Sequence, residues 1–535
     1  MRWCVLLAAA VLAAAPGIAQ QPSPAVRPAR PVNPGLARLR SAVNPEFPVW
    51  GPAYTMERVA EHLASLPEEL RKYVRYLDMS QVPRAKLPYV VSGALFTVPS
   101  MSTAPTVERL RAVPTSDQRL FWLDLRWYCW TAEAWEKVSL EDPYFREPII
   151  PSNSPALRFV RTTIGNGVLR ADWLLYYGGD TSQFLKAGEV KADNAFYYTL
   201  TYAEREVRQK VKVTKQVPKQ VVKYDNYGRG YYTTETTTEE QEEERVVRGV
   251  PPQNAAEFEQ FWKVDLILAR QRQAARGGIV EHGTSVVSYN NRVLSRVQGP
   301  FGGYWRTYDV FRTSGDQDFL EQLPTPPQHF DAGEHIAIDQ KGAQHYFLSN
   351  DKGERVEFGD PRVVHDRVSG ERDIVITWKS CVACHTQGII EMKNELPQVL
   401  EEGVDLKAQE HRRQEIKAFY LSNINRLARR DQDDYTEFVR DCNGLSPQEN
   451  ANQLAAARDW YAAPLSLDQA AREVGARDAR ELADAVSLSP KARLGRLILS
   501  GKPIPRVVWE QSGYAEAALL LLEYRKAAGV PASGK

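Results

Sequence analysis

Residues 381–385 read Cys381-Val382-Ala383-Cys384-His385, and this stretch is the most informative in the chain. Two thiols at this spacing can add to the two vinyl groups of one porphyrin, and the histidine that follows can then reach the iron. We therefore predict one haem c, attached covalently through Cys381 and Cys384, with His385 as the proximal iron ligand.

Two other chemistries use the same pair of thiols. A thiol–disulfide exchange pair also lies between a strand and a helix, but that fold needs further strands after the motif, and this sequence continues with helical patterns. A structural zinc site needs two more ligands. The sequence offers no second Cys-x-x-Cys and no His-x-x-x-His. Haem is the interpretation that we favour, and a thiol–disulfide protein or a non-haem scaffold remains the alternative.

The sixth iron ligand is left open by the sequence. Met392 is the only methionine after His385, and His411 lies in the region with helical patterns. These two are the candidates for the sixth ligand, while His345 and His365 precede the motif and could also reach the iron. A vacant or water-filled position is a further alternative.

The segments on either side of the motif differ in character. Before it, residues 251–375 show short apolar runs separated by turn residues, which predicts a β-rich segment. The expected strands are 278–289, 292–298, 334–339, 344–349, 355–358 and 373–378. After it, residues 376–535 show helical spacing, and Ser466 with Gln469 forms a capping box. The expected helices are 409–427, 434–441, 449–461, 467–474 and 489–499.

Residues 46–200 are rich in aromatic side chains and mix the two kinds of pattern. Helices are expected at 56–76 and 131–138, and strands at 89–98 and 120–125. The sequence therefore predicts an α+β protein. It has a mixed N-terminal domain, a β-rich middle segment and an all-α, cytochrome c-like C-terminal domain that holds the haem.

Residues 201–250 form a charged hairpin or insertion. One arm is basic, the other is acidic, and Asn226 with Gly228 and Gly230 supplies a turn between them. Opposite charges would then face each other across an antiparallel pair. This segment is either a docking surface for a redox partner or a solvated ribbon that its own charges hold together.

The N-terminal end predicts export. An apolar run and the small residues Gly17 and Ala19 are typical of a signal peptide, residues 1–19, with cleavage after Ala19. A proline-rich tether, residues 20–45, follows. No later apolar run approaches the ~20 residues that span a bilayer, so no transmembrane anchor is expected. In an oxidising compartment Cys129 and Cys442 could pair, or could remain separate thiols.

Several motifs resemble the large secreted cytochrome c-like proteins of planctomycetes and related bacteria, which carry one Cys-x-x-Cys-His haem motif behind a long N-terminal extension. The resemblance covers most of residues 50–480. It rests on Asp124-Leu125-Arg126, Trp130, Trp135, Asp142-Pro143-Tyr144, Leu169-Arg170-Ala171-Asp172-Trp173, Asn290-Asn291-Arg292, Gly303-Tyr304-Trp305, Tyr308-Asp309, Gly333-Glu334, and 380–385 with Gln387-Gly388. It implies a single-haem c-type cytochrome without assigning a substrate.

Four residues of these motifs, Arg170, Asp172, Trp173 and Arg292, could be part of a site. An Arg-Asp pair beside a Trp is more often a structural bridge, and that is the interpretation we favour.

Together these observations predict an exported mono-haem c-type cytochrome that transfers one electron at a time between periplasmic redox proteins. A formal net charge of +1 gives no reason to expect nucleic acid as a partner. The alternative is a haem enzyme with an open iron site, for example one that resembles a peroxidase. An electron carrier is the stronger expectation than a catalyst with its own substrate.

Overall fold

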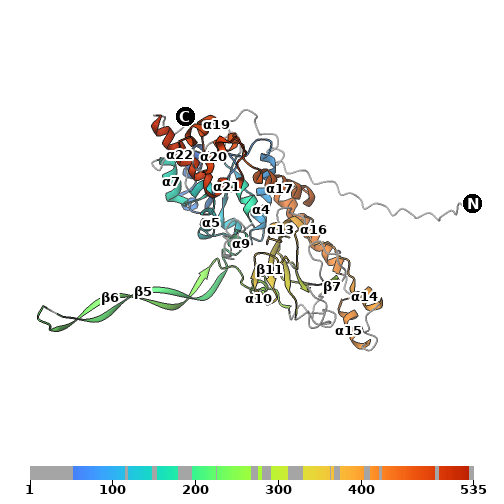
Figure 1. Cartoon of the computed structure of the whole chain (residues 1–535). Coiled ribbons are helices and arrows are strands. Elements are labelled where there is room, and N and C mark those ends of the chain that lie inside the picture. The colour runs from blue at the N-terminus through green and yellow to red at the C-terminus, as the bar shows by residue number, and fades with distance from the viewer. Residues whose placement is uncertain are drawn as a thin grey trace, which may run out of the picture.

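The chain folds as an α+β protein (Figure 1). The computed structural model describes residues 52–114, 119–146, 154–178, 196–224, 226–266, 275–279, 291–310, 329–361, 363–366, 374–402, 410–420, 424–488 and 493–528. The expected signal peptide and tether lie outside these residues. Within them, no helix is long and apolar enough to cross a membrane.

A six-stranded antiparallel sheet occupies the middle of the sequence, in the order β12-β11-β10-β9-β8-β7. Its strands are β7 (Ala275–Ile279), β8 (Asn291–Gln298), β9 (Gly303–Val310), β10 (Ala332–Ile338), β11 (Gln344–Asn350) and β12 (Arg355–Val356). Ile336 of β10 lies opposite Trp305 of β9 and Tyr346 of β11, which fixes the register across its centre. The sequence predicted β8, β10, β11 and β12 and missed β9; the expected strand 278–289 overlaps β7 only at residues 278–279, and its remainder lies outside the described residues.

One expected strand is wrong. Residues 374–378 form no strand, and Ile376 makes only a single bridge to Phe358. The backbone turns instead at Trp378, whose φ of 67° is positive, and enters a short helix, α13 (Lys379–Cys384).

Residues on the strands of this sheet alternate between its two faces. On one face, helix α10 (Ala255–Phe261) packs Phe258 against Phe347, with ring centroids 4.9 Å apart. On the other face lie α13 and α16 (Ile424–Asn443), and Asp431 of α16 accepts a hydrogen bond from Trp305. The sheet is therefore covered on both sides.

A second, four-stranded sheet lies in the N-terminal part, in the order β2-β3-β1-β4. Its strands are β1 (Val74–Asp78), β2 (Arg111–Ala112), β3 (Leu120–Asp124) and β4 (Val168–Arg170). The helices around it are α2 (Pro52–Ser65), α3 (Glu68–Arg71), α4 (Leu87–Ser100), α5 (Ala132–Ser139), α6 (Pro143–Arg146), α7 (Pro155–Ile164), α8 (Ala171–Tyr177) and α9 (Phe196–Thr201), with a 3₁₀ turn at Leu125–Tyr128.

Two predictions for this part are wrong. The expected strand 89–98 is the buried helix α4, whose residues Val90–Ser100 are all buried, so no polar face reveals a helical period. The expected helix 56–76 breaks at Pro67 and ends before β1 begins at Val74. Proline lacks the N–H that a continuous helix would need at that position.

Helices follow the motif, as the sequence predicted. They are α14 (Leu396–Glu402), α15 (Glu410–Tyr420), α16, α17 (Pro447–Ala462), α18 (Leu467–Glu473), α19 (Ala479–Val486), α20 (Arg493–Leu499), α21 (Arg506–Val508) and α22 (Tyr514–Ala527), with one π-helical turn at Trp509–Gly513. The capping box of Ser466 and Gln469 is confirmed at the start of α18, and Ser446 with Glu449 forms another at the start of α17.

The C-terminal helices pack on the N-terminal part of the chain, because α17 contacts both α4 and α8. The largest cluster of buried apolar side chains includes residues of both parts, from Met56 to Leu521, and two smaller clusters lie apart from it. Arg170 crosses this contact: it pairs with Asp172 at 2.5 Å and with Glu473 of α18 at 3.2 Å. Arg170 therefore forms a buried ionic bridge between the N-terminal part of the chain and α18.

The charged hairpin is also confirmed. Strands β5 (Glu206–Tyr224) and β6 (Gly230–Arg248) form a two-stranded antiparallel ribbon that stands away from the rest of the described chain (Figure 1).

Candidate functional site

Helix α13 presents the two cysteines of the motif on the same side, since side chains three residues apart on a helix are neighbours. The backbone of the motif is closed by hydrogen bonds from Val382 N to the Trp378 carbonyl at 2.8 Å and from His385 N to the Cys381 carbonyl at 2.7 Å. Ser380 anchors the helix, because its hydroxyl donates to the Asp366 carboxylate. The motif is thus a fixed turn of helix.

The ring of His385 is oriented by Gly388. Its Nδ1 atom lies 3.1 Å from the Gly388 carbonyl oxygen and donates a proton to it. In the part of the chain that the structure describes, no side chain hydrogen-bonds to the Nε2 atom. Burial lowers the pKa of His385, so the ring is neutral at pH 7 and Nε2 carries a lone pair. A histidine oriented in this way is ready to bind a metal.

Gly388 is required at its position for two reasons. Its φ of 89° lies in the left-handed region. A Cβ atom there would also come within 3.2 Å of the Cβ of Tyr435 and within 3.3 Å of the Cα of Gln432 on α16. Gly388 is therefore the residue of the Gln387-Gly388 sequence that orients His385.

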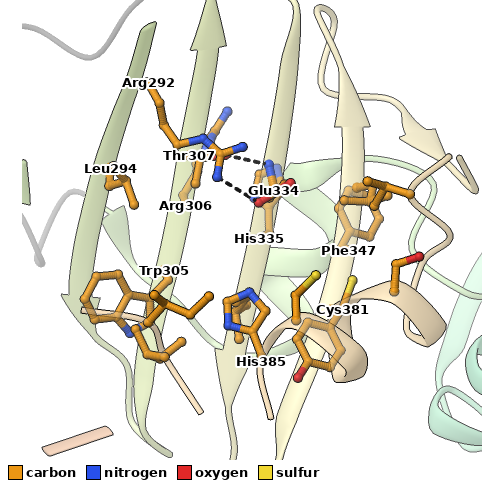
Figure 2. Close-up of a pocket in the computed structure, with 18 of the residues that line it drawn as sticks. Arg292, Leu294, Trp305, Arg306, Thr307, Glu334, His335, Phe347, Cys381 and His385 are labelled. Atoms are coloured by element: carbon orange, nitrogen blue, oxygen red, sulfur yellow. Dashed lines mark hydrogen bonds and ion pairs between the residues drawn. The ribbon is translucent and has the colours of Figure 1, made fainter. Parts of the chain in front are cut away.

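Cys381, Cys384 and His385 open into one pocket between α13 and the six-stranded sheet (Figure 2). It encloses about 1020 Å³ of space between atoms, part of it open to solvent. The other lining residues come mostly from the strands and from the segment after the motif: Arg292, Leu294, Trp305, Arg306, Thr307, Glu334, His335, Ile336, Tyr346, Phe347, Leu348, Val375, Ser380, Ile389, Ile390, Glu391 and Met392. The pocket is thus built by both the β-rich segment, 251–375, and the C-terminal domain, 376–535, that the sequence predicted as separate.

One end of the pocket is polar. Figure 2 shows Arg292, Thr307 and Glu334 gathered beyond the motif, on three neighbouring strands. Arg292 donates to Asp309 at 2.5 Å and to Glu334 at 3.2 Å. Thr307 donates to the other oxygen of Asp309 at 3.0 Å. This is a buried ionic cluster at the edge of an otherwise apolar cavity.

Arg292 retains an unused donor in this cluster. Its Nη2 atom is buried and has no hydrogen-bond partner among the described residues. Although burial opposes its charge, Asp309 and Glu334 hold the pKa of Arg292 above its ordinary value, so it is a cation. Burial raises the pKa of Asp309 to about 6, although Arg292 acts in the opposite direction. A buried guanidinium with a free N–H is suited to a carboxylate oxygen.

The structure places the candidate sixth ligands very differently. Met392 lines the pocket and is 9% exposed. Its backbone is clamped to Asn425 of α16, through bonds of 3.0 Å and 2.7 Å to its N–H and carbonyl. His411 lies on α15 with its side chain 90% exposed, far from any role in lining the pocket. Only Met392 of these two is brought together with His385.

The other histidines near the motif in sequence are not among the pocket-lining residues, with one exception. His345 is buried against Asp339, which lies 2.9 Å from its Nε2 atom. His365 is half-buried and does not line the pocket. His335 does line it, but Tyr304 lies 2.8 Å from its Nδ1 and Ser349 lies 3.0 Å from its Nε2. Both ring nitrogens of His335 are therefore in use.

The environment of the two thiols is apolar. Burial is the main cause that raises the pKa of Cys381 well above its ordinary value and the pKa of Cys384 to about 12. Both are protonated thiols at pH 7, and they are not joined by a disulfide. Cys129 and Cys442 are also free. Among the described residues, no three His, Cys, Asp or Glu side chains gather as a metal-binding group.

The sequence missed most of the pocket wall that the sheet supplies. Trp305, Thr307 and Glu334 were not predicted as site residues, and Arg292 was assigned a structural role. A signal was nevertheless present, because the motifs Asn290-Asn291-Arg292, Gly303-Tyr304-Trp305, Tyr308-Asp309 and Gly333-Glu334 all fall on strands of this sheet. Side chains alternate between the two faces of a strand, so an extended segment here would have been expected to place Trp305, Thr307 and Asp309 on one face.

Searches against protein families, curated proteins and solved structures find no match for this chain. The resemblance to secreted cytochrome c-like proteins therefore remains a prediction from the motifs.

Proposed function

We propose that this protein is an exported mono-haem c-type cytochrome that carries electrons between periplasmic redox proteins. The observation that carries the proposal is the arrangement of three residues in one pocket: the thiols of Cys381 and Cys384, and a His385 ring whose Nδ1 is occupied and whose Nε2 is free. Two thioether bonds and one iron–nitrogen bond need this set of groups.

The residues of the pocket fit a porphyrin. Leu294, Trp305 and Ile336 offer apolar contacts to a flat ring, and the unused N–H of Arg292 suits a propionate carboxylate. When bound, the haem supplies one-electron iron chemistry. Cys381 and Cys384 would hold it, His385 would bind its iron, and the sheet would exclude water from one side.

Met392 supports the carrier role over a catalytic one. A thioether sulfur closing the sixth position would leave no site for a substrate at the iron and would keep the coordination constant between oxidation states. The clamp on the Met392 backbone by Asn425 favours a fixed ligand over a mobile surface residue.

The second candidate is a haem enzyme, favoured by one observation. Glu334 places a carboxylate in the pocket with its side chain 19% exposed, beside Arg292. A carboxylate at this place could contact a substrate bound at an open iron and accept a proton from it. The state of the sixth position separates the two roles.

The thiol–disulfide alternative has less support. Thiols of that class are activated by a lowered pKa. Here burial raises the pKa of both cysteines instead.

The test is to express the full chain with its predicted export signal in a host that has the cytochrome c maturation machinery. We expect the mass of the purified protein to exceed that of the mature polypeptide by one haem, with the colour retained after acid-acetone extraction. The double variant Cys381→Ser/Cys384→Ser should carry no covalent haem. Cys129→Ser is the matched control and should load normally. A parent chain that matures without haem would overturn the proposal.

A further inference from the structure

The ribbon of β5 and β6 is long for a two-stranded structure. Each strand has 19 residues, which at a rise of about 3.3 Å per residue extends over roughly 60 Å. Figure 1 shows the ribbon standing away from the sheets and helices. Isolated two-stranded hairpins are marginally stable in water, so a ribbon of this length calls for a partner on one of its faces.

The two faces of the ribbon differ. One carries a row of half-buried valines on β5: Val207, Val211, Val213, Val217 and Val221. The β6 residues opposite them include Val247, Thr237 and Thr233. This set is the valine face. The valine face also carries charged residues, among them Lys219, Lys223 and Glu235. The reverse face carries charged residues such as Lys210, Lys212, Glu242 and Glu244, and toward the tip the exposed apolar side chains of Val222, Tyr224 and Tyr232.

Charge is divided between the two strands. The basic residues lie on β5 and the acidic residues on β6, and they pair across the ribbon, for example Lys223 with Glu235 at 2.6 Å and Lys212 with Glu240 at 3.6 Å. The pairs of Lys223 with Glu235 and of Lys215 with Glu243 lie on the valine face, and the pair of Lys212 with Glu240 lies on the reverse face. A partner that covers this face must place acidic groups over β5 and basic groups over β6.

We propose that the valine face binds the same face of a second copy of this chain. A two-fold axis that runs along the ribbon, between the stacked faces, places β5 of one copy over β6 of the other, so that basic residues meet acidic ones. An axis across the ribbon would stack β5 on β5 and bring like charges together. The axis along the ribbon is therefore favoured by the opposite charges of β5 and β6. In the dimer that it produces, both hairpin tips lie at the same end.

Pairing along the edges of the ribbon is disfavoured. A symmetric edge pair joins β5 to β5 or β6 to β6, which again opposes like charges. A staggered β5-to-β6 pair would need an unbroken ladder, and Pro218 in the middle of β5 has no N–H to donate. With edge pairing disfavoured, we expect the two ribbons to stack through their valine faces.

The predicted contact is small. A ribbon of roughly 60 Å by about 10 Å buries on the order of 600 Å² per copy, which lies at the low end for specific interfaces. The dimer should therefore dissociate on dilution. It does not depend on the proposed haem function, because none of the ribbon residues lines the haem pocket.

The first test is sedimentation of the full chain over a range of concentrations. We expect the parent to approach twice the mass of one chain as concentration rises. The variant Val213→Lys/Val217→Lys should remain at the mass of one chain. Thr214→Lys/Gln216→Lys, on the reverse face, is the matched control and should dimerise like the parent. A parent that stays monomeric, or a dimer that survives the valine substitutions, would overturn the proposal.

The second test does not depend on lysine being tolerated. Val217 lies opposite Thr237 in the register, so in the dimer Val217 of one copy faces Thr237 of the other. Mixing the single variants Val217→Cys and Thr237→Cys under mild oxidation should give a cross-linked dimer. The reverse-face mixture of Gln216→Cys and Thr238→Cys should give no more than the parent chain. Efficient cross-linking of Val217→Cys with itself would instead mean that the tips point in opposite directions.

Discussion

Arg296 of β8 and Asp431 of α16 form a buried ion pair, with Nη2 2.9 Å and Nε 3.2 Å from the two carboxylate oxygens. Trp305 donates its indole N–H to the same carboxylate at 2.7 Å. The two partners lie 135 residues apart in the chain. This pair therefore ties the sheet wall of the pocket to the helix that flanks Gly388 and Met392.

Breaking this pair should destabilise the protein. Asp431→Ala leaves the Arg296 guanidinium buried without its counter-charge, and such a change costs about 3–5 kcal/mol of unfolding free energy. Denaturant unfolding followed by tryptophan fluorescence measures it. Asp433→Ala, an exposed residue on the same helix, is the control and should stay within about 0.5 kcal/mol of the parent. Equal losses in the two variants would contradict the role given to Asp431.

Replacing the proximal histidine should change the iron without preventing attachment. In His385→Ala both thiols remain, so the mass should still include one haem, but the strong-field nitrogen is gone. We expect a shifted absorption spectrum and a less stable holoprotein. His411→Ala removes an exposed histidine and should leave the spectrum unchanged. If His385→Ala retains the parent spectrum, another residue ligates the iron.

The sixth position is tested at Met392. If its sulfur closes the iron site, the reduced parent should bind carbon monoxide slowly. Met392→Leu, which keeps the apolar volume, should bind it rapidly and lose the sulfur-to-iron charge-transfer band of the oxidised protein. Ile390→Leu, at a neighbouring position of the same pocket, is the control. Rapid binding of carbon monoxide to the parent itself would favour the enzyme role, in which Glu334 handles protons.

The positive charge of Arg292 should raise the reduction potential of a haem bound in the pocket. Arg292→Gln removes a cation that favours the reduced, more negative state, so we expect the reduction potential to fall and to depend more strongly on pH. Arg292→Lys should fall between the glutamine variant and the parent, because it keeps the charge and loses the guanidinium geometry. Redox titration over a pH series measures both effects. Identical potentials in all three proteins would remove Arg292 from the haem site.

Glu473 should contribute to stability in acid. Burial raises its pKa, but Arg170 and Arg506 outweigh this and lower it from 4.5 to about 2. Because the folded value lies below the unfolded one, this group stabilises the fold above pH 4.5, and its contribution disappears as the pH falls toward 2. Glu473→Gln should lose about 3–5 kcal/mol at neutral pH. Its unfolding free energy should then fall less steeply than that of the parent between these pH values.

The sequence predicted elements whose signals are local. The helices α17 and α18 have capping residues and one exposed face, and the ribbon has alternating valines and a turn rich in glycine. Helix α4 was assigned as a strand because a helix that is buried all round shows no 3.6-residue period. The three residues of the motif were found because their chemistry lies in adjacent positions. Arg292, Trp305 and Glu334 were missed as site residues because only the pairing of distant strands brings them to the pocket.

The two walls of the pocket come from parts of the chain that are made at different times. A chain that is exported as proposed crosses the membrane from its N-terminus onward, so β7 to β12 emerge before the residues of α13, and regions that emerge first generally fold first. Until Lys379–Cys384 arrive, the sheet has an apolar face that nothing from the motif covers, with Leu294, Trp305 and Ile336 open to water or to a chaperone. With this order of emergence the thiols would reach a sheet that is already formed, and α13 would be the last element to close the wall of the cavity.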